Sequence, residues 1–283
     1  QVFQYLFIHF HILNIMGTFS KICSDIKSLK IQGAKNIAKA ALRAYSMKPT
    51  KKAKKQLINL RPTEPALFNA LNIAERMSPQ FAEQHFENAQ QFINHYVIKS
   101  IHSKSVIATH CHSNTLSEAL IAAHKSGKSF KVLITETRPL YQGRKTAKQL
   151  SKAGIDVTQF VDSAMHESIK QADIIMLGAD AVTSKGAINK VGSAAIAEIA
   201  KTHKKPVYIV TDSWKFSPKS PPIEQRSEKE VWPKKPKSVH IKNPVFEAIP
   251  QNQITKIISE LGVLSHTQFI KEAKKELKRA VSG

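Results

Sequence analysis

The sequence has few cysteines: Cys23 and Cys111 are the only two among 283 residues. They lie far apart and form no CxxC pair, which excludes a disulfide framework and a cysteine-rich metal site and indicates a reducing compartment. A GxGxxG fingerprint and a Walker phosphate loop are also missing. So is any RNA-binding motif in which aromatic residues alternate with basic ones.

No apolar run is long enough for a membrane span, which needs about 20 residues. The most apolar stretch, residues 1–15, has no lysine or arginine and lacks the basic start and the small-residue cleavage site of a signal peptide. We interpret residues 1–15 as a non-native or disordered extension, with a membrane-surface anchor as the alternative. No membrane partner is expected for the rest of the chain.

Acidic residues are scarce: 21 Asp and Glu stand against 43 Lys and Arg, which gives a formal net charge of +22. Such a charge attracts polyanions, such as phosphorylated metabolites, nucleic acid or an acidic partner. The excess is spread along the chain and is densest at 51–55 and 271–278, which favours solvated surface over a dedicated RNA groove. With 42% hydrophobic and 23% charged residues, the composition is that of a soluble globular protein.

The pattern of the chain changes near residue 103. Before this point apolar residues recur at helical spacing. Gly33 marks a break between two helices, and Pro79 is suited to open a helix that runs to about Ser100. We therefore expect a helical N-terminal domain over residues 16–102.

After residue 103, short β-rich runs alternate with helical stretches. This alternation predicts an α/β fold, with a Rossmann-like C-terminal domain over residues 103–283 that contains a doubly wound parallel sheet. The expected strands are 106–109, 131–135, 157–161, 174–177 and 207–211, and the expected helices are 116–126, 145–153, 165–172 and 193–203. Beyond them we expect an irregular loop at 217–238, a strand at 239–241, a helix at 253–261 and a basic helix from residue 266. Ligands of such sheets bind beyond the carboxyl ends of the strands.

The loop after the first expected strand reads Thr-His-Cys-His-Ser-Asn and carries Cys111. A cysteine at a helix N-terminus between His110 and His112 is expected to have a lowered pKa and to act as a proton carrier or nucleophile. The alternative is a cysteine packed in a tight turn. Two histidines beside one cysteine also suggest zinc, but no second cysteine or carboxylate stands at ligand spacing, so no metal is expected.

Later loops add polar groups at the same rim of the sheet. Arg138 and Gln142 can donate hydrogen bonds to phosphate or hydroxyl oxygens. Asp180 follows a buried strand directly, where a partly desolvated carboxylate can shuttle a proton. The alternatives are a capped turn around Arg138 and an Asx turn at Asp180.

The segment 186–193 precedes an Ala-rich helix and contains Lys190. Together with free backbone N–H groups of Gly192 and Ser193, this lysine predicts a phosphate cradle. A plain helix cap is the alternative. Lys215 follows the expected strand 207–211 at the same rim, where a solvated surface lysine is the alternative.

Taken in order, these motifs resemble one known family. THCHS, ETRPxxQGxxTAxxL, GAD, INKxGS and KF, with 31–34 and 61–63 before them, are similar to the family that unites initiation factor 2B regulatory subunits with methylthioribose-1-phosphate isomerase and archaeal ribose-1,5-bisphosphate isomerase. The resemblance runs from about residue 31 to residue 264. The isomerases carry the Cys and the Asp of these motifs, whereas the regulatory subunits generally lack the Cys. This sequence keeps both, and its THCHS loop looks most like the ribose-1,5-bisphosphate enzyme.

The resemblance implies a cytoplasmic aldose–ketose isomerase of AMP metabolism that converts ribose 1,5-bisphosphate to ribulose 1,5-bisphosphate without cofactor or metal. It implies that Cys111 moves the proton between C2 and C1, while Asp180 serves the protons on O1 and O2. It further implies a homo-oligomer, either a dimer or a hexamer. The residues that it implies for substrate binding are Gly33, Ala34, Arg61, Arg138, Gln142, Asn189, Lys190 and Lys215.

Two positions depart from the isomerase pattern. Gln32 and Asn72 stand where the isomerases carry arginines, which leaves the identity of the sugar phosphate open. The alternative function that the same resemblance implies is a regulatory protein of translation that binds initiation factor 2.

Overall fold

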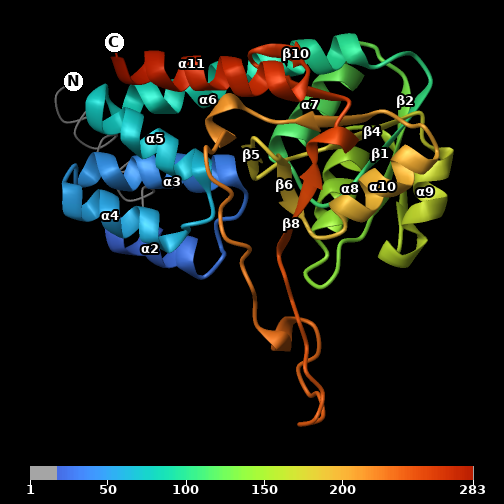
Figure 1. Ribbon diagram of the computed structural model, residues 1–283, viewed down its shortest axis with the longest axis horizontal. Helices are drawn as coiled ribbons and strands as arrows, with labels where there is room; N and C mark the ends of the chain where they lie inside the picture. Colours follow the sequence, from blue (N-terminus) through green and yellow to red (C-terminus); the bar gives the residue numbers. More distant parts are fainter. Residues whose placement is uncertain (1–17, 283) are drawn as a thin grey trace, which may run out of the picture.

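The computed structural model describes residues 18–282 and starts with a group of helices (Figure 1). They are α2 (Phe19–Lys27), α3 (Ala34–Met47), α4 (Lys51–Leu60), α5 (Pro65–Arg76) and α6 (Pro79–Ser100). Gly33 precedes α3 with a φ of 86°, a left-handed value that glycine adopts easily, so the expected break is confirmed. Pro79 at the start of α6 is confirmed as well, with the Ser78 hydroxyl capping the helix through the Phe81 N–H. Residues 1–15 lie outside the described part of the chain.

A seven-stranded sheet follows, in the order β10-β9-β7-β4-β1-β2-β3. Its strands are β1 (Ser105–Thr109), β2 (Phe130–Thr135), β3 (Asp156–Phe160), β4 (Ile174–Leu177), β7 (Val207–Val210), β9 (Lys256–Ser259) and β10 (Gly262–Leu264). All neighbouring strands run parallel except the pair of β9 and β10. The helices that connect or follow them are α7 (Asn114–Lys125), α8 (Gln142–Lys152), α9 (Met165–Gln171), α10 (Ser193–Thr202) and α11 (His266–Ser282). The predicted α/β fold with a parallel sheet is therefore confirmed.

Helices cover both faces of this sheet. Successive strand residues point to opposite faces, so Ile107 packs on one face with α6, α7 and α8, and Ala108 packs on the other with α9, α10 and α11. The long helix α6 belongs to two cores, because Phe86 packs among the N-terminal helices while Ile93 packs against the sheet. Trp214, from the sheet part, packs among the N-terminal helices too. These shared residues tie the helical part to the sheet.

Two expected elements near the C-terminus are wrong. Residues 239–241 form no strand, and residues 253–261 form β9 and the turn to β10 instead of a helix. The apolar spacing of Ile254, Ile257 and Ile258 fits a helix, but it fits equally a short strand that is buried on both sides. β-Branched residues favour that strand, and Ile257 and Ile258 are fully buried in the sheet.

A second, smaller sheet was not expected from the sequence. It joins β5 (Ala181–Thr183), β6 (Gly186–Lys190) and β8 (Phe246–Pro250) in antiparallel order. Between β7 and β8 the chain extends away from the body as an irregular arm (Figure 1), as expected for residues 217–238. The arm contains only the short 3-10 turn Glu228–Glu230 and the turn Ser213–Lys215 precedes it.

A side chain of the small sheet occupies the position that was expected to bind a phosphate, at the start of α10. Glu247 of β8 accepts hydrogen bonds through one oxygen from the backbone N–H groups of Gly192, at 2.7 Å, and Ala194, at 2.6 Å. The prediction that the Gly192 N–H is free for a phosphate is therefore wrong. Glu247 acts as the N-terminal cap of α10, where a carboxylate also complements the helix dipole.

Replacing Glu247 by alanine is expected to lower the free energy of unfolding by about 1–2 kcal/mol, because two N–H groups at the start of α10 lose their acceptor. Urea denaturation of the whole chain measures this change. Asp156→Ala is the matched control, because the Asp156 side chain is 60% exposed in its ion pair with Lys131, and its loss is expected to change stability by less than about 0.5 kcal/mol. Equal losses in both variants would contradict the capping role.

Candidate active site

The order of the strands reverses between β1 and β4, which places the loops after these two strands on either side of a crevice. Cys111 follows β1 and Asp180 follows β4, and both line one cavity of about 100 Å³. The N-terminal helices close the cavity from the opposite side through Gly33, Arg61 and Glu64. The structure thus brings the two expected catalytic residues to one space between the helical part and the sheet.

Cys111 is held in a strained backbone conformation. Its φ of 63° is unusual for a residue with a side chain. Two threonines fix it: the Cys111 N–H donates to the Thr137 hydroxyl at 3.0 Å, and the Thr146 hydroxyl donates to the Cys111 carbonyl at 2.9 Å. The backbone of Cys111 is therefore held in place at the cavity wall, and strained residues of this kind are often found in active sites.

The expected lowering of the Cys111 pKa is wrong. Burial raises the pKa of the thiol to about 12, and the nearby charge of Lys190 only partly opposes this. The helix behind the loop begins at Asn114 with Ser113 as its cap, so Cys111 is not at the helix N-terminus. Burial also lowers the pKa of His112 to about 4, so this ring is neutral and lends the thiol no positive charge.

The side chains of His110 and His112 hydrogen-bond to neighbouring parts of the structure. His110 contacts the Thr135 hydroxyl at 2.5 Å and the Val191 carbonyl at 2.8 Å through its two ring nitrogens. His112 contacts the Thr146 hydroxyl and the Asn114 side chain, both at 2.8 Å. Within residues 18–282, no group of three His, Cys, Asp or Glu side chains is placed to hold a metal ion.

Asp180 has the environment of a proton carrier. Burial raises the pKa of its carboxyl group, while the positive charges of Lys215, Arg61 and Lys190 act in the opposite direction. Its backbone N–H donates to the Ile188 carbonyl at 2.8 Å, which fixes the residue against β6. A buried carboxyl group with a raised pKa, next to basic side chains, is a candidate for general acid–base catalysis.

Lys190 is a buried cation that lacks an anionic partner. Its relative exposure is 4%, and no carboxylate of the described residues lies within ion-pair distance of its amine. Burial lowers the pKa of this amine. A buried lysine without a partner is costly, and an anion bound in the cavity would supply the missing charge.

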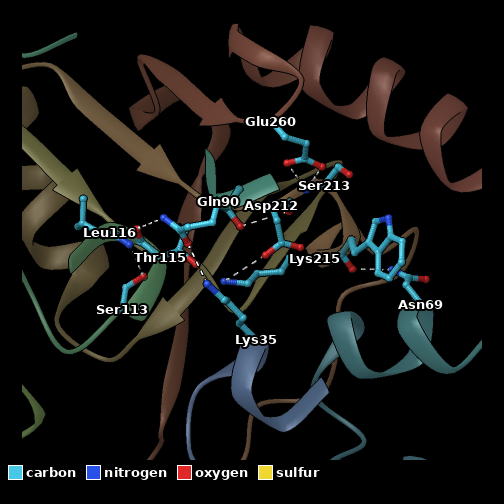
Figure 2. A network of polar contacts seen from close by, with 12 residues as sticks. Lys35, Asn69, Gln90, Ser113, Thr115, Leu116, Asp212, Ser213, Lys215 and Glu260 are labelled. Carbon is cyan, nitrogen blue, oxygen red and sulfur yellow. Dashed lines mark hydrogen bonds and ion pairs between the residues drawn. The ribbon is translucent and has the colours of Figure 1, made fainter. Parts of the chain in front are cut away.

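Lys215 enters the same cavity with a partner behind it (Figure 2). Its amine lies 3.8 Å from the Asp212 carboxylate, and both residues are buried. Asn189 is buried beside Lys190 and donates to the Ser193 hydroxyl at 2.8 Å. Lys35 enters from α3, and its amine lies 3.1 Å from the Gln90 side chain (Figure 2). The Glu118 carboxylate lies 2.9 Å from the same amine.

Arg61 lines the cavity but already has carboxylate partners. One of its terminal nitrogens lies 3.3 Å from Glu64 and 3.1 Å from Glu224, a residue of the arm. Its Nε is buried and has no partner among the described residues. Arg226 of the arm also lines the cavity and lies 3.2 Å from Glu224.

The structure brings most of the expected binding residues to this cavity, and leaves one outside. Arg138 does not line it, because its guanidinium donates to the Tyr141 hydroxyl at 2.6 Å and to the Val231 carbonyl at 3.2 Å. Asn72 is exposed on α5, away from the cavity, whereas Gln32 lines it. The expected residues that do line it are Gly33, Ala34, Arg61, Cys111, Gln142, Asp180, Asn189, Lys190 and Lys215.

Four charged residues of the cavity were not expected from the sequence. Lys35 and Lys145 lie on helix faces, where charged residues are ordinary surface groups, and Arg226 lies in an arm that gives no structural pattern. Glu64 directly follows the Arg-Pro-Thr segment at 61–63, and this neighbourhood was the one available signal.

None of the helices in the described part of the chain has both the length and the apolar character that crossing a membrane requires.

Comparison with known proteins places this architecture among solved structures. A chain from Pyrococcus horikoshii, described as translation initiation factor eIF-2B, superposes with a TM-score of 0.81 at 24% identity and covers 89% of this chain and 98% of its own. At that identity the likeness shows the fold. The 5-methylthioribose 1-phosphate isomerase of the same organism superposes with a TM-score of 0.72 at 27% identity, covering 93% of this chain and 88% of its own.

Sequence relatives cover nearly the same span. A ribose 1,5-bisphosphate isomerase from Archaeoglobus fulgidus is 35% identical over 84% of this chain and 87% of its own length. A methylthioribose-1-phosphate isomerase from Heliobacterium modesticaldum is 31% identical over 86% of each chain. The family model described as the initiation factor 2 subunit family matches residues 27–266. With the strand order, the cavity and these matches in agreement, the chain belongs to the initiation factor 2 subunit family.

Proposed function

We propose that this protein is an aldose–ketose isomerase of a phosphorylated sugar, with ribose 1,5-bisphosphate as substrate and ribulose 1,5-bisphosphate as product. The observation that carries the proposal is the shared cavity of Cys111, Asp180 and the unpaired, buried Lys190. The relatives that bear the name ribose 1,5-bisphosphate isomerase, at 35% identity over most of the chain, support the choice of sugar. The reaction is expected to proceed in a homo-oligomer in the cytoplasm.

The proposed reaction moves one proton between carbons and others between oxygens. In the proposal Asp180 acts first as an acid and gives a proton to the sugar oxygen that is released when the ring opens; burial, which raises the pKa of its carboxyl group, favours this role. Cys111 takes the proton from C2 as a thiolate and returns it to C1. Asp180, now a carboxylate, accepts the proton from the C2 hydroxyl as the ketone forms. Both side chains thereby return to their starting states, and the sugar is isomerised without any net oxidation.

The thiolate form of Cys111 is the scarce component of this scheme. Burial favours the neutral thiol, and Lys190 is the positive charge that opposes it. Lys190 therefore has two roles in the proposal: it attracts the phosphorylated substrate, and it favours the thiolate that removes the proton. In the proposal Lys215 and Asn189, which line the same cavity, stabilise the negative charge that develops on O2.

A regulatory role in translation is the second candidate. Several structural relatives are described as eIF-2B or its subunits, but at 24% identity or less they share the fold alone. The cavity carries an acid–base pair, which binding of a partner protein does not need. This feature favours the isomerase.

Replacing Cys111 by serine is expected to reduce kcat by at least about 10²–10⁴-fold, the contribution typical of a general acid or base, because a hydroxyl group is a far weaker carrier of the C2 proton. The measurement follows formation of ribulose 1,5-bisphosphate from ribose 1,5-bisphosphate by purified enzyme.

Cys23→Ala is the matched control, because Cys23 is buried among the N-terminal helices and does not line the cavity. Its turnover number is expected to stay near that of the wild-type enzyme. Full activity in Cys111→Ser, or no turnover by the wild-type protein, would refute the proposed reaction and favour the regulatory alternative.

Replacing Lys190 by methionine is expected to raise the KM for the sugar phosphate by about 10–100-fold, because one charge-assisted hydrogen bond contributes about 1.5–3 kcal/mol. It should also lower kcat, since the thiolate of Cys111 loses the positive charge of Lys190 that favours it. Lys185→Met, an exposed position in the turn before β6, is the control and should leave both constants unchanged. An unchanged KM in Lys190→Met would mean that this lysine does not hold the substrate.

A further inference from the structure

Glu64 is a charged residue of the cavity that the proposed reaction does not use. It lies at the N-terminal end of α5 and is 2% exposed. Its side chain does not cap that helix; it lies at the cavity wall, with its Oε1 3.3 Å from a terminal nitrogen of Arg61. Its other oxygen, Oε2, is buried and has no hydrogen-bond partner among the described residues. A buried carboxyl oxygen without a partner is costly unless a ligand completes it.

The position of Glu64 conflicts with the binding of an anion if its carboxyl group is ionised. Arg61 is the cation of this corner, and a phosphoryl group that approaches it also approaches Glu64. An ionised Glu64 would repel that group, whereas a protonated Glu64 can donate a hydrogen bond from its second oxygen. The two protonation states therefore have opposite effects on the same ligand.

The surroundings of Glu64 favour the protonated state. Burial and the negative charge of Asp180 raise its pKa to about 8, whereas Arg61 and Lys215 lower it. Glu224 of the arm adds a further negative charge. The groups that act on Glu64 from the segment between α4 and α5, the arm and the sheet loops are thus two cations and two carboxylates, and they leave the cost of burial dominant.

We propose that Glu64 is a further substrate-binding residue, which donates a hydrogen bond from Oε2 to a phosphoryl oxygen that is held at the same time by Arg61. This inference rests on the proposed function for the choice of ligand. In this proposal one phosphate of a sugar bisphosphate binds beside Arg61. Glu64 recognises that phosphate by donating a hydrogen bond to it. Binding then requires one proton on Glu64, so affinity falls as this proton is lost.

The test measures binding of ribose 1,5-bisphosphate by isothermal titration calorimetry in the Cys111→Ser background, in which the sugar stays intact. Affinity is expected to fall about tenfold between pH 7 and pH 9, because each pH unit above the pKa of Glu64 adds a tenfold cost of protonation. In the double variant with Glu64→Gln, whose amide is always a donor, affinity at pH 7 should match the parent within about threefold. The tenfold loss of affinity between pH 7 and pH 9 that is due to Glu64 should be absent in this double variant.

Proton uptake gives an independent measurement. At pH 8, titrations in two buffers of different ionisation enthalpy should show uptake of about half a proton more in the parent than in the Glu64→Gln variant. Thermal unfolding of each protein confirms that it is folded.

Glu224→Gln is the matched control, because Glu224 is the other carboxylate on the same nitrogen of Arg61. This variant should keep the alkaline fall in affinity, with its midpoint at a slightly lower pH because one negative charge near Glu64 is removed. Identical pH profiles in parent and Glu64→Gln would overturn the proposal, as would loss of binding by Glu64→Gln at pH 7. Turnover by the wild-type enzyme is assayed separately, so failure of the isomerase assignment is distinguishable from failure of this inference.

Discussion

The reversal of strand order between β1 and β4 is the constraint on which the site depends. On one side of this point the connections carry the chain toward β2 and β3, and on the other toward β7 and β9. The loops after β1 and β4 are thereby separated, and a crevice opens between them. Cys111 and Asp180 lie 69 positions apart in the sequence, and this topology brings both to the crevice that the helical part closes into one cavity.

The helical part turns that crevice into an enclosed site. The helix α6 packs with its first half among the N-terminal helices and with its second half on the sheet. This shared packing holds Arg61 and Glu64 opposite the loops of the sheet. Enclosure then controls the chemistry, because burial raises the pKa values of the Cys111 thiol and of the carboxyl groups of Asp180 and Glu64. A site whose acids are harder to ionise and whose buried lysine is unpaired suits an anionic ligand.

Particular residues explain why the sequence predicted one part of the structure and not another. The parallel sheet was predictable because its strands are short, β-rich and separated by amphipathic helices. The strand β6 was not predictable, because the polar residues Asn189 and Lys190 interrupt its apolar pattern. Both are buried because they line the cavity. The capping contact of Glu247 could not be predicted either, since Glu247 and Gly192 lie 55 residues apart in the sequence. The pKa of Cys111 was mispredicted because local sequence shows neighbouring histidines and does not show burial.

The sequence by itself determined the family motifs, the alternation of strands and helices, and the identity of the thiol, the carboxyl group and the lysines. Those features are local, because they depend on residue type and short spacing. The tertiary structure decided which of these groups meet, which are neutral and which are already paired. Arg138 was thereby directed to Tyr141 and Val231, Glu64 was brought to the cavity, and Lys190 was left without a partner. Distance and burial fix charge and pairing, and both arise only when remote segments pack together.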